Sequence, residues 1–360
     1  MASPHPRFHR LTIHDLRRET PGAVSIAFAV PPDLSDDYAF APGQYLTLRA
    51  HMDGEEVRRS YSICSGPDDD ELRVAIKKVD GGAFSGWAAE ELKAGDAIDV
   101  MTPTGRFGVA PAPDEARTYV GFAAGSGITP IISIVRGVLA REPLSRFFLF
   151  YGNRTTQDML FREALEELKD RYIGRFSLFH VLSQEEQDIP ILHGRLDRAK
   201  VEVLLRAMVP AAAVDHVFVC GPAAMSEEIE ATCRDSGIAP ERIHVERFVS
   251  ELGGKPHPKA KVVEGAPPRA MAALIVDGKR REVPVAEGEA ILDAALRAGM
   301  DLPFACKGGM CSTCRAKVVE GETRMDVNYS LEPWELEAGF VLTCQAHPLT
   351  PRVVVDYDQM

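Results

Sequence analysis

The sequence has no apolar run approaching the roughly 20 residues that a membrane-spanning helix requires. Its first ten residues, MASPHPRFHR, also lack the apolar segment of a secretory signal. Basic side chains are outnumbered, because 41 Lys and Arg stand against 53 Asp and Glu and leave a net charge of −12. Since nonspecific nucleic-acid binding requires a basic surface, that function is disfavoured. We therefore expect a cytoplasmic protein that binds neither membranes nor nucleic acids.

The composition is that of an ordinary globular protein. At about 100–200 residues per domain, a chain of 360 residues predicts two or three domains. Hydrophobic residues make up 45% of the chain, which is enough to fill several cores. A chain that is disordered over its whole length is therefore excluded. No general acid–base constellation and no metal-hydrolase motif is evident in the sequence.

Four of the seven cysteines are clustered towards the C-terminus. They follow the pattern C-x4-C-x2-C, and the fourth comes after 29 intervening residues. This is the spacing of plant-type [2Fe–2S] sites, in which two irons need four thiolates, two on each metal. An odd number of cysteines makes a disulfide framework unexpected. The predicted metal ligands are Cys306, Cys311, Cys314 and Cys344.

The loop between the first two of these cysteines suits a cluster. Gly308 and Gly309 let the backbone approach the inorganic sulfides and point N–H groups at them. A structural zinc site is an alternative, although zinc motifs usually contain two C-x2-C pairs and only Cys311 and Cys314 form one here. Four reduced, unligated thiols are the second alternative.

The residues around the cluster loop predict a small domain of their own. Residues 272–285 form two short β runs around an Asp-Gly turn, which is a hairpin signature. Residues 287–299 carry apolar side chains at helical spacing, and residues 315–320 and 353–355 have the composition of strands. Together they predict a β-grasp-like module that resembles a plant-type ferredoxin over residues 269–360.

The first third of the chain consists of short β-rich runs separated by turn signals, which predicts an antiparallel barrel. One run contains Arg59, Tyr61 and Ile63 in alternation, so that a phosphate-binding and a ring-stacking side chain share one face. An ordinary surface strand is the alternative. The predicted strands are Ala23–Val30, Gln44–Arg49, Val57–Ile63, Leu72–Val79 and Ala97–Met101.

A glycine turn, Gly81–Ser85, precedes a predicted helix over 86–92. Free N–H groups at a helix start can bind a pyrophosphate, although a plain turn before a helix has the same sequence. A second glycine turn, Gly125–Pro130, lies between a predicted strand over 119–124 and a predicted helix over 131–140. This is the geometry of a dinucleotide site, but Pro130 stands where the third glycine of the G-x-G-x-x-G motif would be.

From Thr118 onwards strands and helices alternate, which predicts a parallel sheet with helices on both faces. Gly125, Gly152 and Cys220 lie at predicted strand ends, so these signals converge on one crevice. The remaining predicted strands and helices are 146–151, 158–170, 175–182, 199–208, 214–220, 223–236 and 242–248.

The fold class that follows is a multidomain α+β protein. We predict an antiparallel barrel domain over 1–111, a dinucleotide-binding α/β domain over 112–250 and a [2Fe–2S] ferredoxin domain over 269–360. The family resemblance given next implies that the barrel binds FAD and that the α/β domain binds NAD(P). Residues 251–268 are rich in Gly, Pro and Lys and are predicted to be a linker, whose mobility would let the ferredoxin domain meet first its donor and then an outside acceptor.

Five motifs in order, RRSYS, GGAFS, GSGITP, CGPAAM and VERF, resemble those of the ferredoxin–NADP reductase superfamily. The C-terminal cysteine pattern narrows the resemblance to the reductases of multicomponent oxygenases. Within that group, YGNRTTQDMLFREAL, LHGR, ILDAALRAGMDLPFACKGGMCSTC and NYSLEPWELEAGFVLTCQAHPLT are similar to the reductase subunits of phenylacetyl-CoA epoxidases. The resemblance runs from end to end. It implies electron flow from NADPH through FAD and a [2Fe–2S] cluster to a di-iron epoxidase.

The resemblance also implies roles for single residues. Ser62, Cys220 and Glu246 match a Ser–Cys–Glu set near the hydride path, with Ser62 near the flavin N5. Without its motif, Cys220 would be taken for a buried thiol at a strand end. The implied cofactor-binding residues are Arg59, Tyr61, Ser62, Ile63 and Phe248 for the flavin, Gly82, Ala83, Phe84 and Ser85 for its pyrophosphate, and Gly125, Ser126, Gly127, Ile128, Thr129, Pro130, Cys220, Gly221 and Pro222 for the nicotinamide dinucleotide.

The resemblance implies NADPH as the nucleotide, although one residue departs from the pattern of NADP-specific relatives. NADP-specific relatives often carry a Ser-Arg pair after the third strand of this domain, and here the pair is Ser183-Gln184. Arg154 and Arg195 are the candidates to bind the 2′-phosphate instead. We expect NADPH, with NADH as the alternative. A reductase for another oxygenase, such as a steroid hydroxylase, and a non-catalytic redox sensor remain open.

Overall fold

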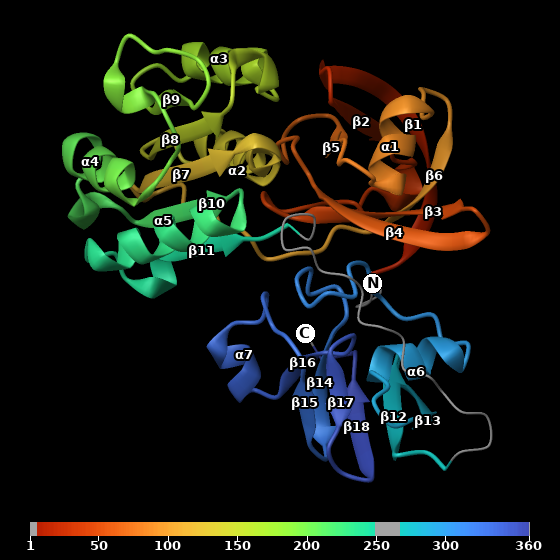
Figure 1. Cartoon of the computed structure of the whole chain (residues 1–360). Helices are drawn as coiled ribbons and strands as arrows, with labels where there is room; N and C mark the ends of the chain where they lie inside the picture. The colour runs from red at the N-terminus through yellow and green to blue at the C-terminus, as the bar shows by residue number, and fades with distance from the viewer. Residues whose placement is uncertain (1–5, 249–266, 360) are drawn as a thin grey trace.

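The computed structural model describes residues 6–248 and 267–359, which form three large sheets and a two-stranded sheet of β15 and β17 (Figure 1). The first sheet and the second lie beside each other, and the third lies against them with its helices α6 and α7. The predicted linker over 251–268 falls almost wholly outside the described residues. Within the described part, no helix combines the length and the apolar character needed to cross a membrane.

The first sheet is the predicted antiparallel barrel. Its strand order is β4-β3-β6-β1-β2-β5, and an antiparallel bridge between Ile63 and Val74 joins the two edge strands. The interior is filled by aliphatic side chains such as Leu11, Ile26 and Leu48. The elements are β1 (Phe8–Thr20), β2 (Ala23–Ala29), β3 (Tyr45–Met52), β4 (Glu55–Ser62), β5 (Leu72–Lys77), α1 (Ala83–Glu90) and β6 (Ala97–Met101).

Two details of the barrel differ from the sequence prediction. Strand β1 was not predicted, because Leu11 and Ile13 are its only fully buried side chains and most of its other residues are polar. It is a strand because it pairs with both β2 and β6. Helix α1 begins at Ala83 rather than at Gly86, so Gly82 directly precedes the helix as its N-cap.

The second sheet is parallel in all its pairings, in the order β11-β10-β7-β8-β9. Side chains of α2 and α3 belong to one core and side chains of α4 and α5 to another, as expected for helices on opposite faces of a sheet. The elements are β7 (Thr118–Ala124), α2 (Ile128–Arg141), β8 (Arg146–Asn153), α3 (Arg162–Arg171), β9 (Phe176–Leu182), α4 (Arg198–Met208), β10 (His216–Cys220), α5 (Ala223–Asp235) and β11 (Ile243–Glu246).

Helix α3 starts four residues later than its apolar periodicity predicts. Phe161 has a φ of 57°, in the left-handed region, and this interrupts the helical path between Asp158 and Arg162. The apolar spacing in the sequence extends beyond the helix because Leu160 and Phe161, which precede it, are buried in the same core.

The third sheet has the order β13-β12-β18-β14-β16 and packs against α6. The Asp277-Gly278 turn has positive φ at both residues, as the predicted hairpin requires. The short elements β15, β16, β17 and α7 were not predicted, since none exceeds five residues. The elements are β12 (Ala270–Val276), β13 (Lys279–Val285), α6 (Ile291–Arg297), β14 (Arg315–Glu320), β15 (Thr323–Met325), α7 (Pro333–Glu337), β16 (Phe340–Leu342), β17 (Ala346–Pro348) and β18 (Arg352–Asp356).

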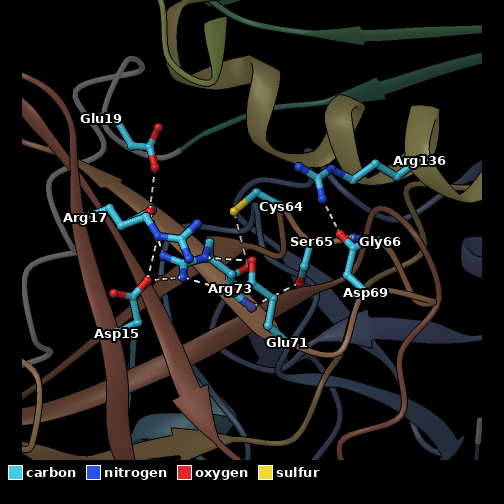
Figure 2. Close-up of polar contacts among 11 residues, drawn as sticks. Asp15, Arg17, Glu19, Cys64, Ser65, Gly66, Asp69, Glu71, Arg73 and Arg136 are labelled. Carbon is cyan, nitrogen blue, oxygen red and sulfur yellow. Dashed lines mark hydrogen bonds and ion pairs between the residues drawn. The ribbon is translucent and has the colours of Figure 1, made fainter. Parts of the chain in front are cut away.

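The loop between β4 and β5 joins the barrel to the nucleotide sheet. The Ser133 hydroxyl on α2 donates to the Ser65 carbonyl at 2.7 Å. Arg136 on the same helix pairs with Asp69, as Figure 2 shows. Behind the loop, the buried Arg73 side chain donates to Glu71 at 3.0 Å. The Arg73 carbonyl accepts a hydrogen bond from the Cys64 thiol. The contacts of Ser65 and Asp69 with α2 thus connect the barrel to the nucleotide domain.

Candidate functional site

One cleft of about 2110 Å³ runs between the three sheets and is lined by residues from each. It is bounded by β4 and the start of α1, by the carboxyl ends of the parallel strands, and by the cluster loop. The predicted site residues that line it are Arg59, Tyr61, Ser62, Gly82, Ala83, Phe84, Ser85, Gly125, Ser126, Thr129, Arg154, Ser183, Arg195, Pro222, Glu246, Phe248, Cys306 and Cys311.

The other predicted site residues are buried and do not line the cleft. Ile63 belongs to the barrel core and lies one residue beyond the end of β4. A side-chain role for Ile63 at the flavin therefore finds no support in its position. The remaining residues of this group are Gly127, Ile128, Pro130, Cys220, Gly221, Cys314 and Cys344.

One wall of the cleft, called the flavin wall below, brings together the RRSYS motif (residues 58–62) and the GGAFS motif (residues 81–85). The rings of Tyr61 on β4 and Phe84 on α1 have centroids 5.9 Å apart. Gly82 leaves no room for a side chain, because a Cβ there would lie 2.6 Å from the Ser85 Oγ. The Ser85 hydroxyl accepts from the Val79 N–H at 3.1 Å and fixes the turn before the helix. Backbone N–H groups at the start of α1 thus face the cleft beside a strand that carries Arg59.

The three residues of the implied Ser–Cys–Glu set lie close together. The Ser62 hydroxyl donates to the Glu246 carboxylate at 3.1 Å, across the boundary between barrel and nucleotide sheet. Glu246 pairs in parallel register with Cys220 on the neighbouring strand. Burial raises the pKa of Glu246 to about 8, although the Ser62 hydrogen bond acts in the opposite direction.

The GSGITP turn packs directly against the end of β10. Gly125 has a φ of 52°, which favours glycine, and its carbonyl accepts from the Tyr151 hydroxyl at 3.1 Å. A Cβ on Gly127 would lie 2.1 Å from the Cys220 carbonyl oxygen. Only a glycine therefore lets the start of α2 approach Cys220 and Gly221 this closely, and this places the two predicted nucleotide motifs side by side.

The candidate 2′-phosphate residues lie along the same side of the cleft. The Gln184 N–H donates to the Arg154 carbonyl at 2.9 Å, so the segments after β8 and β9 are adjacent. The exposed Arg154 side chain pairs with Asp158 at 3.1 Å, and Arg195 lines the cleft nearby together with Ser183. Two guanidinium groups are thus available to a phosphate at this end of the cleft.

Backbone N–H groups of the cysteine loop point at the sulfur atoms of the loop's own cysteines. The Gly308 N–H donates to the Cys306 Sγ at 3.3 Å, and the Cys306 N–H donates to the Cys311 Sγ at 3.5 Å. On the far side, the Gln345 side chain donates to the Cys344 Sγ at 3.5 Å. Sequence reasoning missed Gln345, although its position next to a predicted ligand was a usable signal.

The four thiols form two pairs. Cys306 hydrogen-bonds Cys311, and Cys314 hydrogen-bonds Cys344. Among residues 6–248 and 267–359, no three His, Cys, Asp or Glu side chains are grouped around a position for one metal ion. Two pairs of thiols and a ring of N–H donors fit a two-iron cluster with two thiolates on each iron.

Contacts between the barrel and the cluster domain were not predicted. The Arg58 guanidinium lies 3.9 Å from the centroid of the Phe304 ring and donates to the Leu302 carbonyl at 3.4 Å. Arg106 donates to the buried Glu335 of α7 at 2.6 Å. No motif marks these pairs, because their members are more than 200 residues apart in the sequence.

Sequence models of three domain families match the chain. They are the oxidoreductase FAD-binding domain over residues 24–108, the oxidoreductase NAD-binding domain over residues 122–231 and the 2Fe-2S iron-sulfur cluster binding domain over residues 274–349. The three matches fall on the barrel, the parallel sheet and the third sheet, in the order that the sequence predicts. The chain thus combines an FAD-binding, a pyridine-nucleotide-binding and a [2Fe–2S]-binding domain.

Curated relatives cover nearly the whole chain. The chain is 46% identical over 355 residues to a subunit of the 1,2-phenylacetyl-CoA epoxidase from Escherichia coli K12, with 98% of each chain covered. It is 31% identical over 353 residues to the ferredoxin reductase component of 3-ketosteroid-9-alpha-monooxygenase from Rhodococcus rhodochrous, with 96% of each covered. Among solved structures, phthalate dioxygenase reductase shares the fold, with a TM-score of 0.56 at 22% identity over 97% of this chain and 98% of that one.

Proposed function

Because the chain belongs to the family of NAD(P)H-dependent flavin and iron–sulfur reductases that serve multicomponent oxygenases, we propose that it reduces a phenylacetyl-CoA epoxidase with electrons from NADPH. The observation that carries this proposal is the single cleft onto which the flavin wall, the nucleotide turn and the cluster loop all open. The higher identity to the epoxidase protein than to the ketosteroid monooxygenase component favours the epoxidase as partner.

The bound cofactors supply the redox chemistry, since FAD accepts a hydride from the nicotinamide and the [2Fe–2S] cluster takes up electrons singly. The protein supplies binding and orientation. Ser62 and Glu246 would present a hydrogen-bonded pair to the reacting part of the flavin. Arg59 and the N–H groups after Gly82 would hold its phosphates, and Gly125–Gly127 would hold those of the nucleotide. Phe248 would cover the flavin site from the end of the nucleotide sheet.

The preference for NADPH is attributed to Arg154 and Arg195. We expect Arg154→Ala and Arg195→Ala each to raise the KM for NADPH about tenfold, because each removes one charge-assisted hydrogen bond worth about 1.4 kcal/mol. The KM for NADH, which lacks the phosphate, should stay nearly constant in both variants. Steady-state assays with the two nucleotides measure this, and an equal rise in both KM values would contradict the assignment.

The identity of the partner is tested by exchange of oxygenases. Supplied with NADPH, the reductase should support turnover of a phenylacetyl-CoA epoxidase about tenfold or more better than turnover of a ketosteroid monooxygenase, as a difference of about 1.4 kcal/mol in productive docking implies. Product formation at equal reductase concentration is the measurement. A preference for the steroid oxygenase would instead assign the chain to the second class of partner.

A further inference from the structure

Tyr45 connects the flavin wall to the cluster loop. It is the first residue of β3 and pairs in register with Ser62 on β4, so it lies next to the flavin site. Its hydroxyl donates to the Cys311 carbonyl and lies 2.8 Å from the Thr313 hydroxyl in the ferredoxin domain. The Thr313 hydroxyl in turn lies 3.2 Å from the Cys311 Sγ. A continuous set of hydrogen bonds therefore runs from the flavin wall to a cluster ligand.

The surroundings of Tyr45 are shaped to hold this ring. Only 6% of the side chain is exposed. A Cβ on Gly105, which has a φ of 111°, would lie 2.9 Å from the ring, so this glycine leaves the space that the ring occupies.

Other contacts between the barrel and the ferredoxin domain among the described residues differ from this one. Arg58 contacts Phe304, Leu302 and Asp301. Arg106 contacts Glu335, and Arg7 pairs with Asp277. None of these partners is a cysteine of the cluster loop. Tyr45 alone among these barrel residues bonds to a cysteine of the loop. Its effect should therefore fall on the cluster rather than on domain contact in general.

We propose that Tyr45 is a positioning residue for electron transfer from the flavin to the cluster, acting through its hydrogen bonds to Cys311 and Thr313. The inference rests on the proposed function and adds a residue to it. In the step concerned, each electron that the flavin loses is gained by one iron of the cluster, and Tyr45 keeps its proton and is not oxidised.

The test is Tyr45→Phe, studied in the full chain by anaerobic stopped-flow mixing with NADPH. The ring and its packing stay, and only the hydroxyl is lost. Reduction of the flavin should keep its rate, whereas reduction of the cluster should slow roughly three- to tenfold, as expected for one lost hydrogen bond. The electron paramagnetic resonance signal of the dithionite-reduced cluster measures cluster content independently of turnover. Thr313→Val removes the bond from the ferredoxin side and should slow the same step.

Tyr38→Phe is the matched control. Its hydroxyl is also buried in the barrel and donates to a carbonyl, that of Val100, at 2.7 Å. Its hydrogen bonds among the described residues, to Val100 and His9, stay within the barrel. Both rates should be unchanged in this variant. The proposal is overturned if either Tyr45→Phe or Thr313→Val reduces an intact cluster within twofold of the normal rate, or if Tyr38→Phe slows cluster reduction equally. Failure of NADPH to reduce the flavin in the unaltered chain would instead reject the proposed function.

Discussion

Replacement of Cys344 by serine is expected to remove the cluster and uncouple the two halves of the reaction. Cys344 is buried, pairs with Cys314 and receives a hydrogen bond from Gln345. Mutation of a residue that only hydrogen-bonds a metal ligand typically lowers metal affinity or activity about 10–100-fold. Loss of a ligand itself should have a larger effect, so we expect delivery of electrons to the oxygenase to fall more than roughly 100-fold. Reduction of the flavin by NADPH should continue, because Ser62 and Glu246 are untouched.

The variant is checked by iron content, by visible absorption and by electron transfer to the oxygenase. Cys233→Ala is the matched control, since Cys233 is equally buried but lies on α5 in the core of the nucleotide domain. It should retain both iron and electron delivery. A Cys344→Ser protein that keeps a full complement of iron and normal electron delivery would show that Cys344 is not a ligand.

The second large effect is expected from Gly127→Ala. The added methyl group would lie 2.1 Å from the Cys220 carbonyl oxygen and 2.5 Å from its carbon, which are backbone atoms that cannot rotate away. The start of α2 must therefore separate from the end of β10. Overpacking of this kind costs about 1–3 kcal/mol, and reduction of the flavin by NADPH should slow roughly 10- to 100-fold.

Gly22→Ala provides the comparison, because a Cβ at Gly22 meets nothing within 4 Å and its φ is not in the left-handed region. It should reduce its flavin at the normal rate. Stopped-flow measurement of the visible flavin absorption follows both proteins. A normal rate in Gly127→Ala with an unchanged melting temperature would contradict the close packing of the two motifs at the nucleotide site.

The sequence predicted best what is local and periodic. Apolar runs bounded by glycine turns placed most strands of the barrel and of the parallel sheet within a few residues of their observed ends. The cysteine spacing predicted four cluster ligands, and in the folded chain the four thiols lie together as two hydrogen-bonded pairs. Strand β1 was missed because Leu11 and Ile13 are its only buried side chains, so its apolar pattern is weak.

The contacts between domains could not be predicted in the same way. Tyr45 and Cys311 are 266 positions apart, and the hydrogen bond between them depends on how two separately folded domains meet. Neither residue type nor spacing carries that information. The Ser62–Glu246 pair, 184 positions apart, was expected only from the family resemblance, and the burial that raises the pKa of Glu246 appears only in the folded chain.

The most direct test of the account is an anaerobic visible spectrum of the purified protein, recorded before and after stoichiometric NADPH and repeated with NADH. We expect flavin and iron–sulfur absorption that bleach together, with NADPH the faster donor. A colourless zinc protein, or a flavin that neither nucleotide reduces, would contradict the electron path from nucleotide to cluster and favour a structural or sensory role.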